Sequence, residues 1–374
     1  MKKVFILMML IAVAFGINAQ PKHNNVDSTP HNGEYPQTNL MRAQWDVLQE
    51  FNTLDDSQPG IATNGTHFFT STWDNDYFQQ YDMDGSNGVQ FTIPGVDVGI
   101  DEMTYVESTG LFYGVDGYSM KIYAMDLENQ TLSSIIPVTC TGVPSLILIC
   151  YDPQLDGGAG GFWIGDWDEL GAVDMNGNEL VAGIVHNYDT YGSVYDNWTD
   201  PDNPKLWFFC QDYADGDDTM LAEYDINTQS FTGTSYDVAD NTGTAGGACS
   251  YVRPDGTVAL VVVIQNNANS NIVREYEFVS PANVSLSPTS HDYGNVSVGT
   301  STSHTFTLTN TGGMAAEFES LVISGADASF FDYQNDYFLN AVDIPAGGSV
   351  TIDIEYNPTA VGNHTAVATF ETSA

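Results

Sequence analysis

The chain has 374 residues, with 8 Lys and Arg against 49 Asp and Glu and a formal net charge of −41. Hydrophobic residues make up 42% of the sequence, which is enough for a sizeable core in about two domains. A polyanion lacks the cations that neutralise phosphates, which excludes nucleic acids and anionic membrane surfaces as partners. The 35 glycines and 12% aromatic residues favour β-structure with many tight turns.

Residues 1–19 have the pattern of a secretory signal peptide. Lys2 and Lys3 precede an apolar run over 4–15, and Ala19 is the small residue that a signal peptidase accepts. The apolar run is too short to span about 30 Å of hydrocarbon, which disfavours a membrane anchor. We therefore expect a secreted or cell-surface protein whose mature chain does not insert into a membrane. The polar residues 20–40 are expected to form a flexible leader.

Four cysteines occur in the chain, and an exported protein can keep disulfides. Four cysteines allow three pairings, among which the sequence does not choose, and buried free thiols fit the pattern equally well. The four are Cys140, Cys150, Cys210 and Cys249.

Residues 41–280 contain a repeat with a period of roughly 45–50 residues, the length of one propeller blade. An aromatic or β-branched strand comes early in each copy, and an acidic residue ends the strand after it. The acidic residues are Asp82, Asp126, Asp174, Asp225 and Glu277.

An outer strand follows the first four copies of the repeat, whereas the fifth copy has none. A strand-like segment, Gln44–Phe51, lies before the first copy and has no partner there. We therefore predict a five-bladed β-propeller over 41–280, closed by pairing of Gln44–Phe51 with Ile272–Phe278, because closure removes the open edge. Six blades are the alternative.

Residues 282–374 have a different composition, in which Trp and Cys are absent and polar and apolar residues alternate. The alternation over 305–308 and 350–354 predicts strands with one buried and one solvated face. Glycines in the turns at 310–313 and 345–348 supply the positive φ that tight turns need. This pattern predicts a β-sandwich, so that the whole chain is all-β.

The C-terminal segment resembles the Ig-like domains of the abnormal spindle/Hydin group, known in bacterial proteins as "choice-of-anchor D" domains. The stretches that carry the resemblance are Val284–Pro288, Asp292–Gly299, His304–Gly312, Ile344–Ile354 and Tyr356–Gly362. The resemblance implies a spacer or interaction module. Domains of this group usually have one more strand after 366–370, so we expect either a fragment or a sandwich that lacks an edge.

One face of the predicted propeller carries the candidate site. In a four-stranded blade, the loop between the second and third strands lies on the same side as the connection to the next blade. Four of these five loops combine an acid with an aromatic residue, a pairing that suits sugars because rings stack on them while polar groups bind their hydroxyls. The alternative is a solvated acidic rim. The predicted ligand-binding residues are Trp73, Asp74, Asp76, Asp116, Tyr118, Asp166, Trp167, Asp168, Asp212 and Tyr213.

Calcium is the one cofactor that the sequence suggests. Asp215, Asp217 and Asp218 place several carboxylates close together in a chain with few cations, and calcium accepts flexible sets of oxygen ligands. Asp82–Gly88 begins like a calcium loop but lacks its glycine and glutamate, so we expect a hairpin turn there. The histidines show no metal-ligand spacing, which disfavours zinc.

These observations predict an exported binding or cell-surface protein. Its propeller would present an acidic and aromatic face to a glycan or another extracellular ligand, and its Ig-like domain would act as a spacer. The alternative is an exported propeller glycosidase that acts on a polysaccharide through a carboxylate pair. A purely structural, adhesin-like protein is a third hypothesis. The balance favours a protein that is not an enzyme, and the ligand and oligomeric state stay open.

Overall fold

The computed structural model describes residues 3–6, 44–73, 75–186, 188–212, 217–238, 243–265, 269–333 and 343–374. It has two compact units, of which the first extends to Ser280 and the second combines residues from 281 onward with strand β1 (Lys3–Ile6). Helical structure in the described residues is limited to α1 (Leu155–Gly158) and the 3-10 turn η1 (Ala328–Phe330). The predicted all-β class is confirmed.

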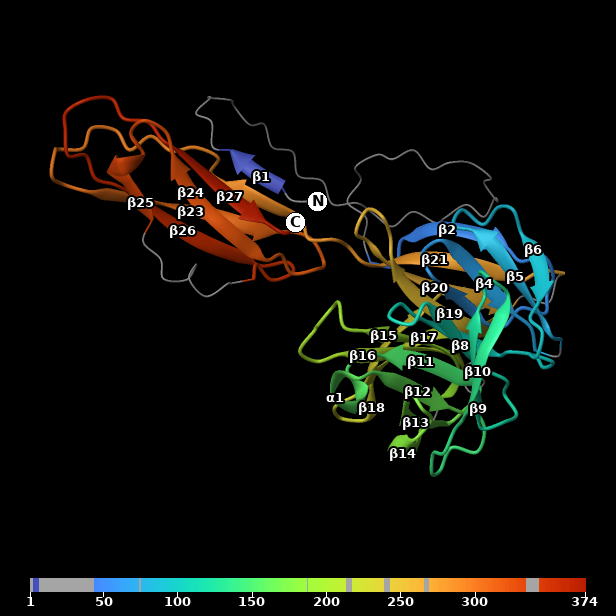
Figure 1. Ribbon diagram of the computed structural model, residues 1–374. Helices are drawn as coiled ribbons and strands as arrows, with labels where there is room; N and C mark the ends of the chain where they lie inside the picture. The colour runs from blue at the N-terminus through green and yellow to red at the C-terminus, as the bar shows by residue number, and fades with distance from the viewer. Residues whose placement is uncertain are drawn as a thin grey trace. The chain divides into compact units, whose positions relative to one another are not determined.

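The first unit contains four-stranded antiparallel sheets, five of them within its described residues (Figure 1). The first sheet has β3 (Ile61–Thr63), β4 (His67–Ser71), β5 (Tyr77–Asp82) and β6 (Val89–Thr92). The second has β7 (Glu102–Val106), β8 (Leu111–Val115), β9 (Lys121–Asp126) and β10 (Thr131–Pro137). The third has β11 (Leu148–Asp152), β12 (Gly161–Gly165), β13 (Glu169–Asp174) and β14 (Glu179–Val185).

The two remaining sheets of this unit follow the same order of strands. The fourth has β15 (Asp189–Asp196), β16 (Lys205–Asp212), β17 (Asp217–Asp225) and β18 (Ser230–Asp237). The fifth has β19 (Thr244–Val252), β20 (Val258–Gln265), β21 (Ile272–Val279) and β2 (Val47–Asn52). The strands β3, β7, β11, β15 and β19 contact one another in this order, and β19 also contacts β3. First strands that meet around a common axis are how propeller blades are arranged.

Aromatic side chains on the second strands join neighbouring sheets. The rings of Phe69 in β4 and Phe112 in β8 lie 5.0 Å apart, and those of Tyr113 in β8 and Phe162 in β12 lie 4.9 Å apart. All four side chains are buried. Large rings in edge-to-face contact bury much apolar area, which explains why these strands are so rich in Phe, Tyr and Trp.

The N-terminal strand completes the fifth sheet, which confirms the predicted pairing. β2 pairs with β21 in antiparallel register, with Val47 opposite Tyr276. The strand begins at Val47 instead of Gln44, because Trp45 has a φ of 74° in the left-handed region and leaves the strand path. The Trp45 ring instead stacks on Tyr236, with ring centroids 4.6 Å apart.

The cysteine thiols do not form disulfides. None of the four is bonded to another cysteine in the described structure, and Cys140, Cys150 and Cys210 are buried while Cys249 is half-buried. Burial raises the pKa of the Cys140 and Cys150 thiols. The thiols therefore act as small apolar side chains of the core.

The second unit has two sheets that pack over one core. One sheet contains β22 (Val284–Ser287), β23 (Thr302–Asn310), β26 (Ser349–Tyr356) and β25 (Phe331–Tyr333). The other contains β1, β27 (Val367–Thr372) and β24 (Phe318–Ser324). Phe306 and Ile352 of the first sheet and Phe370 of the second are buried in the same cluster, which is how a sandwich closes its core.

Candidate functional site

Two of the predicted loops, 116–119 and 166–169, lie at one end of the sheets of the first unit and are joined by hydrogen bonds through the connecting segments 144–147 and 188–191. The Gly117 amide donates to the Leu146 carbonyl at 2.8 Å, and the Ser145 hydroxyl donates to Asp166 Oδ2 at 2.7 Å. The Thr190 amide donates to the carbonyl of Trp167 at 2.9 Å. We call this surface the loop face. It comprises residues 73, 75–76, 116–119, 144–147, 166–169 and 188–191.

Asp116 and Asp166 fix the conformations of the loops in which they lie. The Asp116 carboxylate, with only 4% of the residue exposed, accepts hydrogen bonds from the Ser119 amide and hydroxyl at 2.7 Å each. It also accepts one from the Tyr123 hydroxyl at 3.1 Å. Asp166 accepts from the Trp167 amide at 2.8 Å in addition to Ser145. Both carboxylates are therefore occupied by their own surroundings.

The aromatic residues that follow these two aspartates point into solvent. Tyr118 is 79% exposed and Trp167 is 49% exposed, although both are large rings. Because the loops are fixed by hydrogen bonds, a ligand that stacks on these rings would lose little conformational freedom of the chain. Asp76 is also exposed on this face.

Trp73 has a different position, because it joins three sheets instead of facing outward. Its indole Nε1 donates to Gln265 Oε1 at 3.3 Å, and its ring lies edge-on to Tyr191 at 6.3 Å. Trp73 follows β4, Gln265 ends β20 and Tyr191 belongs to β15. This contact therefore lies where the sheets converge.

Asp168 and Glu169 form a carboxyl pair beside Trp167. Burial, together with a hydrogen bond to Asp168 and the charges of Asp168 and Asp166, raises the pKa of Glu169 to about 7. Glu169 therefore keeps its proton over part of the neutral range. Sequence reasoning included Asp168 but missed Glu169. The raised pKa of Glu169 depends first on the burial of this residue at the start of β13, which the sequence does not show.

Glu102 is a buried carboxyl that sequence reasoning did not select. It lies inside β7 and is 1% exposed. Its Oε1 accepts from the amides of Ala248 at 3.2 Å and Ser193 at 3.4 Å, whereas Oε2 has no hydrogen-bond partner within the described part of the chain. Burial raises the pKa of Glu102 well above its ordinary value.

The remaining candidate residues are only partly described. Asp74, Tyr213 and Asp215 lie outside the described residues, and Asp212 and Asp217 are described by backbone alone, opposite each other in β16 and β17. Asp218 is half-buried, and its Oδ1 has no hydrogen-bond partner among the described atoms. Among residues with a described position, no group of three or more His, Cys, Asp or Glu side chains suits a metal ion.

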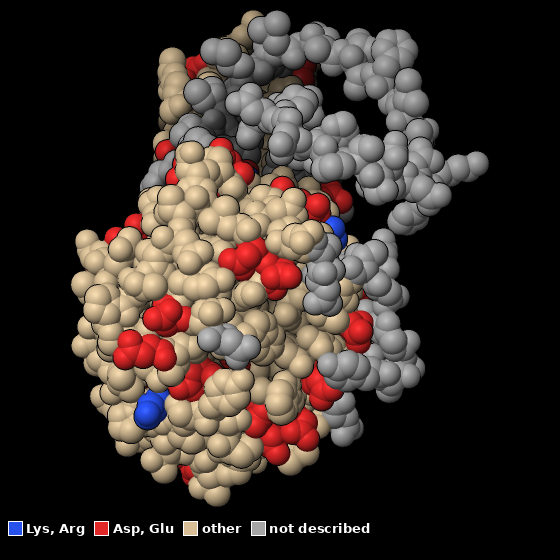
Figure 2. All heavy atoms as spheres, turned by 90° about the vertical axis from the view of Figure 1, so that its right-hand side faces the viewer, with Lys and Arg blue, Asp and Glu red and all other residues tan. Residues whose placement is uncertain are grey.

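Acidic side chains are spread over the surface in separate groups. Figure 2 shows several such groups on one side of the molecule, with basic side chains at few places. Neighbouring carboxylates without cations between them create a negative potential that attracts cations and repels anions, so the surface admits neutral or cationic ligands more readily than anionic ones.

Two solved structures are distantly similar to this chain. A crystal structure of glutaminyl cyclase from Myxococcus xanthus is 11% identical, with a TM-score of 0.44 over 62% of this chain and 96% of that chain. Hydrazine synthase from Kuenenia stuttgartiensis is 12% identical, with a TM-score of 0.35 over 75% of this chain and 67% of that chain. Neither likeness is close enough to indicate a function. No curated protein matches the chain.

Within the described residues, no helix has the length and apolar character to cross a membrane. Residues 282–374 match the family model of the HYDIN/CFA65/VesB-like Ig-like domain, which confirms the resemblance predicted from the sequence.

Proposed function

We propose that this protein is exported and binds a glycan at the loop face of its first unit. The observation that carries the proposal is the pair of exposed rings, Tyr118 and Trp167, on neighbouring loops that Asp116 and Asp166 hold in place. A sugar ring has apolar faces that stack on such side chains. Its hydroxyls would bind to Asp168, Glu169 and Asp76 beside the rings.

The charge of the protein narrows the class of glycan. With a formal net charge of −41, the chain repels anionic polysaccharides, so a neutral or amine-bearing glycan fits best. The signal peptide expected over 1–19 supports a location where such glycans occur. The Ig-like domain would then hold the binding unit away from its point of attachment.

A glycan array, followed by titration calorimetry with the best neutral hit, tests the proposal. We expect Tyr118→Ala and Trp167→Ala each to weaken binding by about three- to tenfold, the size of one ring contact. Tyr333→Ala is the matched control, because this partly exposed ring lies in the second unit. Unchanged affinity in both loop-face variants would refute the site.

The alternative, a glycosidase, finds one supporting observation in the Glu169 carboxyl, whose pKa of about 7 suits a general acid. However, the carboxyl group that contributes most to this shift, after burial, is that of Asp168, which directly precedes Glu169 in the chain. Carboxyl pairs of glycosidases lie at least about 5 Å apart to leave room for the sugar. This proximity favours binding without hydrolysis, and we expect the bound glycan to be recovered intact after long incubation.

A further inference from the structure

Two histidine rings lie face to face at the rim of the Ig-like core. His304 belongs to β23, and His291 belongs to the segment that connects β22 to β23. The two ring centroids are 3.5 Å apart, and the ring planes differ by 6°. Both side chains are half-buried. Because rings at this spacing are in van der Waals contact over their faces, the pair holds the connecting segment against β23.

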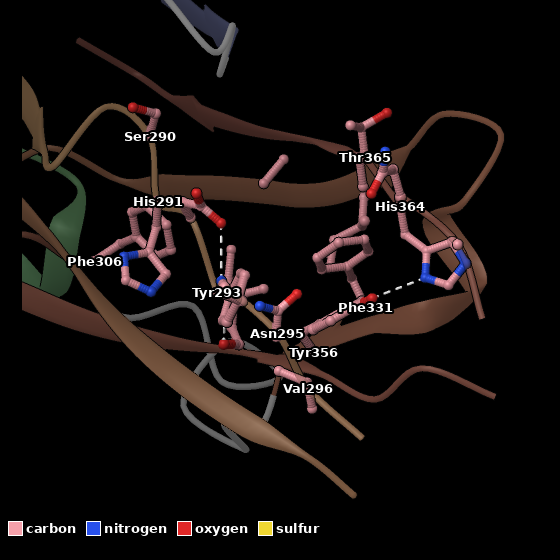
Figure 3. A pocket seen from close by; sticks show the side chains of 18 residues that line it. Ser290, His291, Tyr293, Asn295, Val296, Phe306, Phe331, Tyr356, His364 and Thr365 are labelled. Atoms are coloured by element: carbon pink, nitrogen blue, oxygen red, sulfur yellow. Dashed lines mark hydrogen bonds between the residues drawn. The ribbon is translucent and has the colours of Figure 1, made fainter. Parts of the chain in front are cut away.

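The segment around His291 forms part of the wall of a pocket in the Ig-like unit. Residues 290–296 line this pocket of about 320 Å³, and Figure 3 shows His291 and Tyr293 among the lining side chains. The Tyr293 ring lies edge-on to the His291 ring, with centroids 4.7 Å apart. The Tyr293 hydroxyl donates to the Ile354 carbonyl of β26 at 2.7 Å. The stacked pair and Tyr293 therefore attach one short segment to two neighbouring strands, β23 and β26.

Few charges from the neighbouring strands face the histidine pair. His304 follows the alternation that buries Phe306, so its side chain lies on the inner face of β23. Asp353 and Glu355 of β26 stand next to the buried residue 354, which is opposite His304, so their side chains belong to the outer face. Asp292 is the acid beside His291. The Ig-like unit from residue 282 onward contains no Lys or Arg.

The other walls of the pocket bring one further histidine. β24 and β27 line the pocket with Ile323 and Ala368, which do not titrate. His364 Nδ1, in the segment before β27, is hydrogen-bonded to the Tyr356 hydroxyl at 2.8 Å. The protonation of the stacked pair is therefore governed mainly by its own two rings and by Asp292.

The pair can take up one proton without separating, but not two. A single imidazolium can lie over the face of a neutral ring, whereas two positive charges at this spacing repel each other. Burial and then the charge of His304 lower the pKa of His291, while Asp292 raises it. A released ring would titrate near the ordinary value of 6.5. The stacked arrangement is therefore fully stable above about pH 6.5 and loses stability as the pH falls below this value.

We propose that His291 and His304 form an acid-sensitive contact, which releases the segment 290–296 from β23 when both rings are protonated. Release turns His291 toward solvent and exposes Tyr293, because the two side chains share one short segment. The Ig-like unit is then firmly packed at neutral pH and opens at this one place in acid. This property belongs to the second unit and is independent of the glycan binding proposed for the first.

The titration of His291 is the first test, measured by NMR on the full chain with labelled histidine. His304→Gln removes the second ring but keeps a polar side chain at that position. We expect His291 to titrate at least about half a pH unit higher in this variant than in the unsubstituted chain, because the repulsion is gone. His67→Gln removes a histidine of the first unit and is the control, in which the titration of His291 should not change. Equal titration of His291 in all three proteins would overturn the proposal.

Release of the segment is measured by hydroxyl-radical footprinting with mass spectrometry, between about pH 7.5 and about pH 4.5. Tyr293 should become about threefold more reactive in acid, because local opening exposes its half-buried ring. Tyr333 is already 37% exposed and is the internal reference, whose reactivity should stay constant. In His304→Gln, the reactivity of Tyr293 should not depend on pH. His291→Gln gives the same test if His304→Gln does not fold.

Two footprinting results would also overturn the proposal. Constant reactivity of Tyr293 in the unsubstituted chain would show that the pair stays stacked in acid. An equal increase in the unsubstituted chain and in His304→Gln would show that protonation of carboxylates, and not of the two imidazoles, loosens the unit. Neither result bears on glycan binding, which is measured at the first unit, so the two proposals fail separately.

Discussion

Single carboxylates have opposite roles in this protein, depending on their partners. Asp116 accepts hydrogen bonds that hold its loop, whereas Glu102 is buried with one oxygen that has no partner in the described structure. The sequence was sufficient to place Asp116 and Trp167 on loops, because turn residues are local signals. It could not single out Glu102, because the burial of this residue depends on strands that are distant in the chain. Nor could it single out Glu169, because the raised pKa of that carboxyl depends first on burial.

Removal of the Asp116 carboxylate should destabilise the first unit. In Asp116→Ala, the Ser119 amide and the Tyr123 hydroxyl lose their acceptor in a buried position. We expect a loss of about 1–3 kcal/mol in the free energy of unfolding, measured by urea denaturation. Asp76→Ala is the control, because that side chain is exposed and should change stability by less than about 0.5 kcal/mol. Equal effects of the two substitutions would contradict a positioning role for Asp116.

The buried carboxyl of Glu102 should give stability a defined pH dependence. Its pKa in the folded chain is raised above the ordinary value of 4.5, so the folded state holds a proton that the unfolded chain releases as the pH rises above that value. The contribution to stability is present in full below pH 4.5 and is lost as the pH rises toward the raised pKa. Glu102→Gln keeps the shape of the side chain but does not titrate.

The difference in unfolding free energy between the unsubstituted chain and Glu102→Gln should therefore fall steadily from about pH 4.5 upward. Urea denaturation at a series of pH values measures it. A difference that stays constant over this range would mean that Glu102 keeps its ordinary pKa and that a charged carboxylate is tolerated in this buried position.

The sequence predicted the pairing of strands better than it predicted the surroundings of single side chains. The missing outer strand of the last repeat and the unpaired N-terminal strand are enough to predict the β2–β21 pair, which the structure confirms. The start of β2 was misplaced because the aromatic residue Trp45 looks like a strand residue, and only its positive φ and its packing on Tyr236 exclude it. The sequence did not predict that β1 pairs with β27. Nothing in the pattern of residues 3–6 distinguishes a strand from part of a signal segment.

The Trp45 ring should stabilise the packing of the fifth sheet, which contains β2, against the fourth sheet. The ring stacks on Tyr236 and lies 5.3 Å from the Trp207 ring, so Trp45→Ala would open a cavity between the fourth and fifth sheets. We expect a loss of up to about 3 kcal/mol, with the change shared by the whole first unit in a single melting transition. Val89→Ala, at an exposed position of β6, is the matched control and should leave the transition unchanged. If Trp45→Ala loosened only β2 and left the melting transition of the unit unchanged, the other sheets would not depend on the pairing of β2 with β21.

For the whole molecule, the dominant feature is an excess of 49 acidic over 8 basic residues. Self-repulsion of this size weakens the compact state, and the large cores of the two units must offset it. These cores are separate, since each buried cluster draws its residues from one unit only. Length and composition predict about two domains. Which acidic side chains lie next to each other on the surface depends on the fold.

Calcium is the compensating cation that we propose for the carboxylates around β17. Asp217 opens that strand opposite Asp212, and Asp218 Oδ1 is buried without a described partner. An ion bound only by the folded chain raises its stability by about 2.7 kcal/mol at a hundredfold excess over Kd. Millimolar calcium should therefore raise the melting temperature more than sodium chloride of equal ionic strength, which acts by screening alone.

The triple substitution of Asp215, Asp217 and Asp218 by Asn should remove much of this difference. A matched triple substitution by Asn of Asp76, Asp84 and Asp156, exposed acids elsewhere in the first unit, makes the net charge less negative by the same amount and should leave the calcium effect intact. The comparison separates binding at one place from general screening, because both variants carry the same total charge. Equal melting temperatures in calcium and in matched sodium chloride would show that the acids form only a solvated rim, and the excess charge would then be neutralised by diffuse counterions.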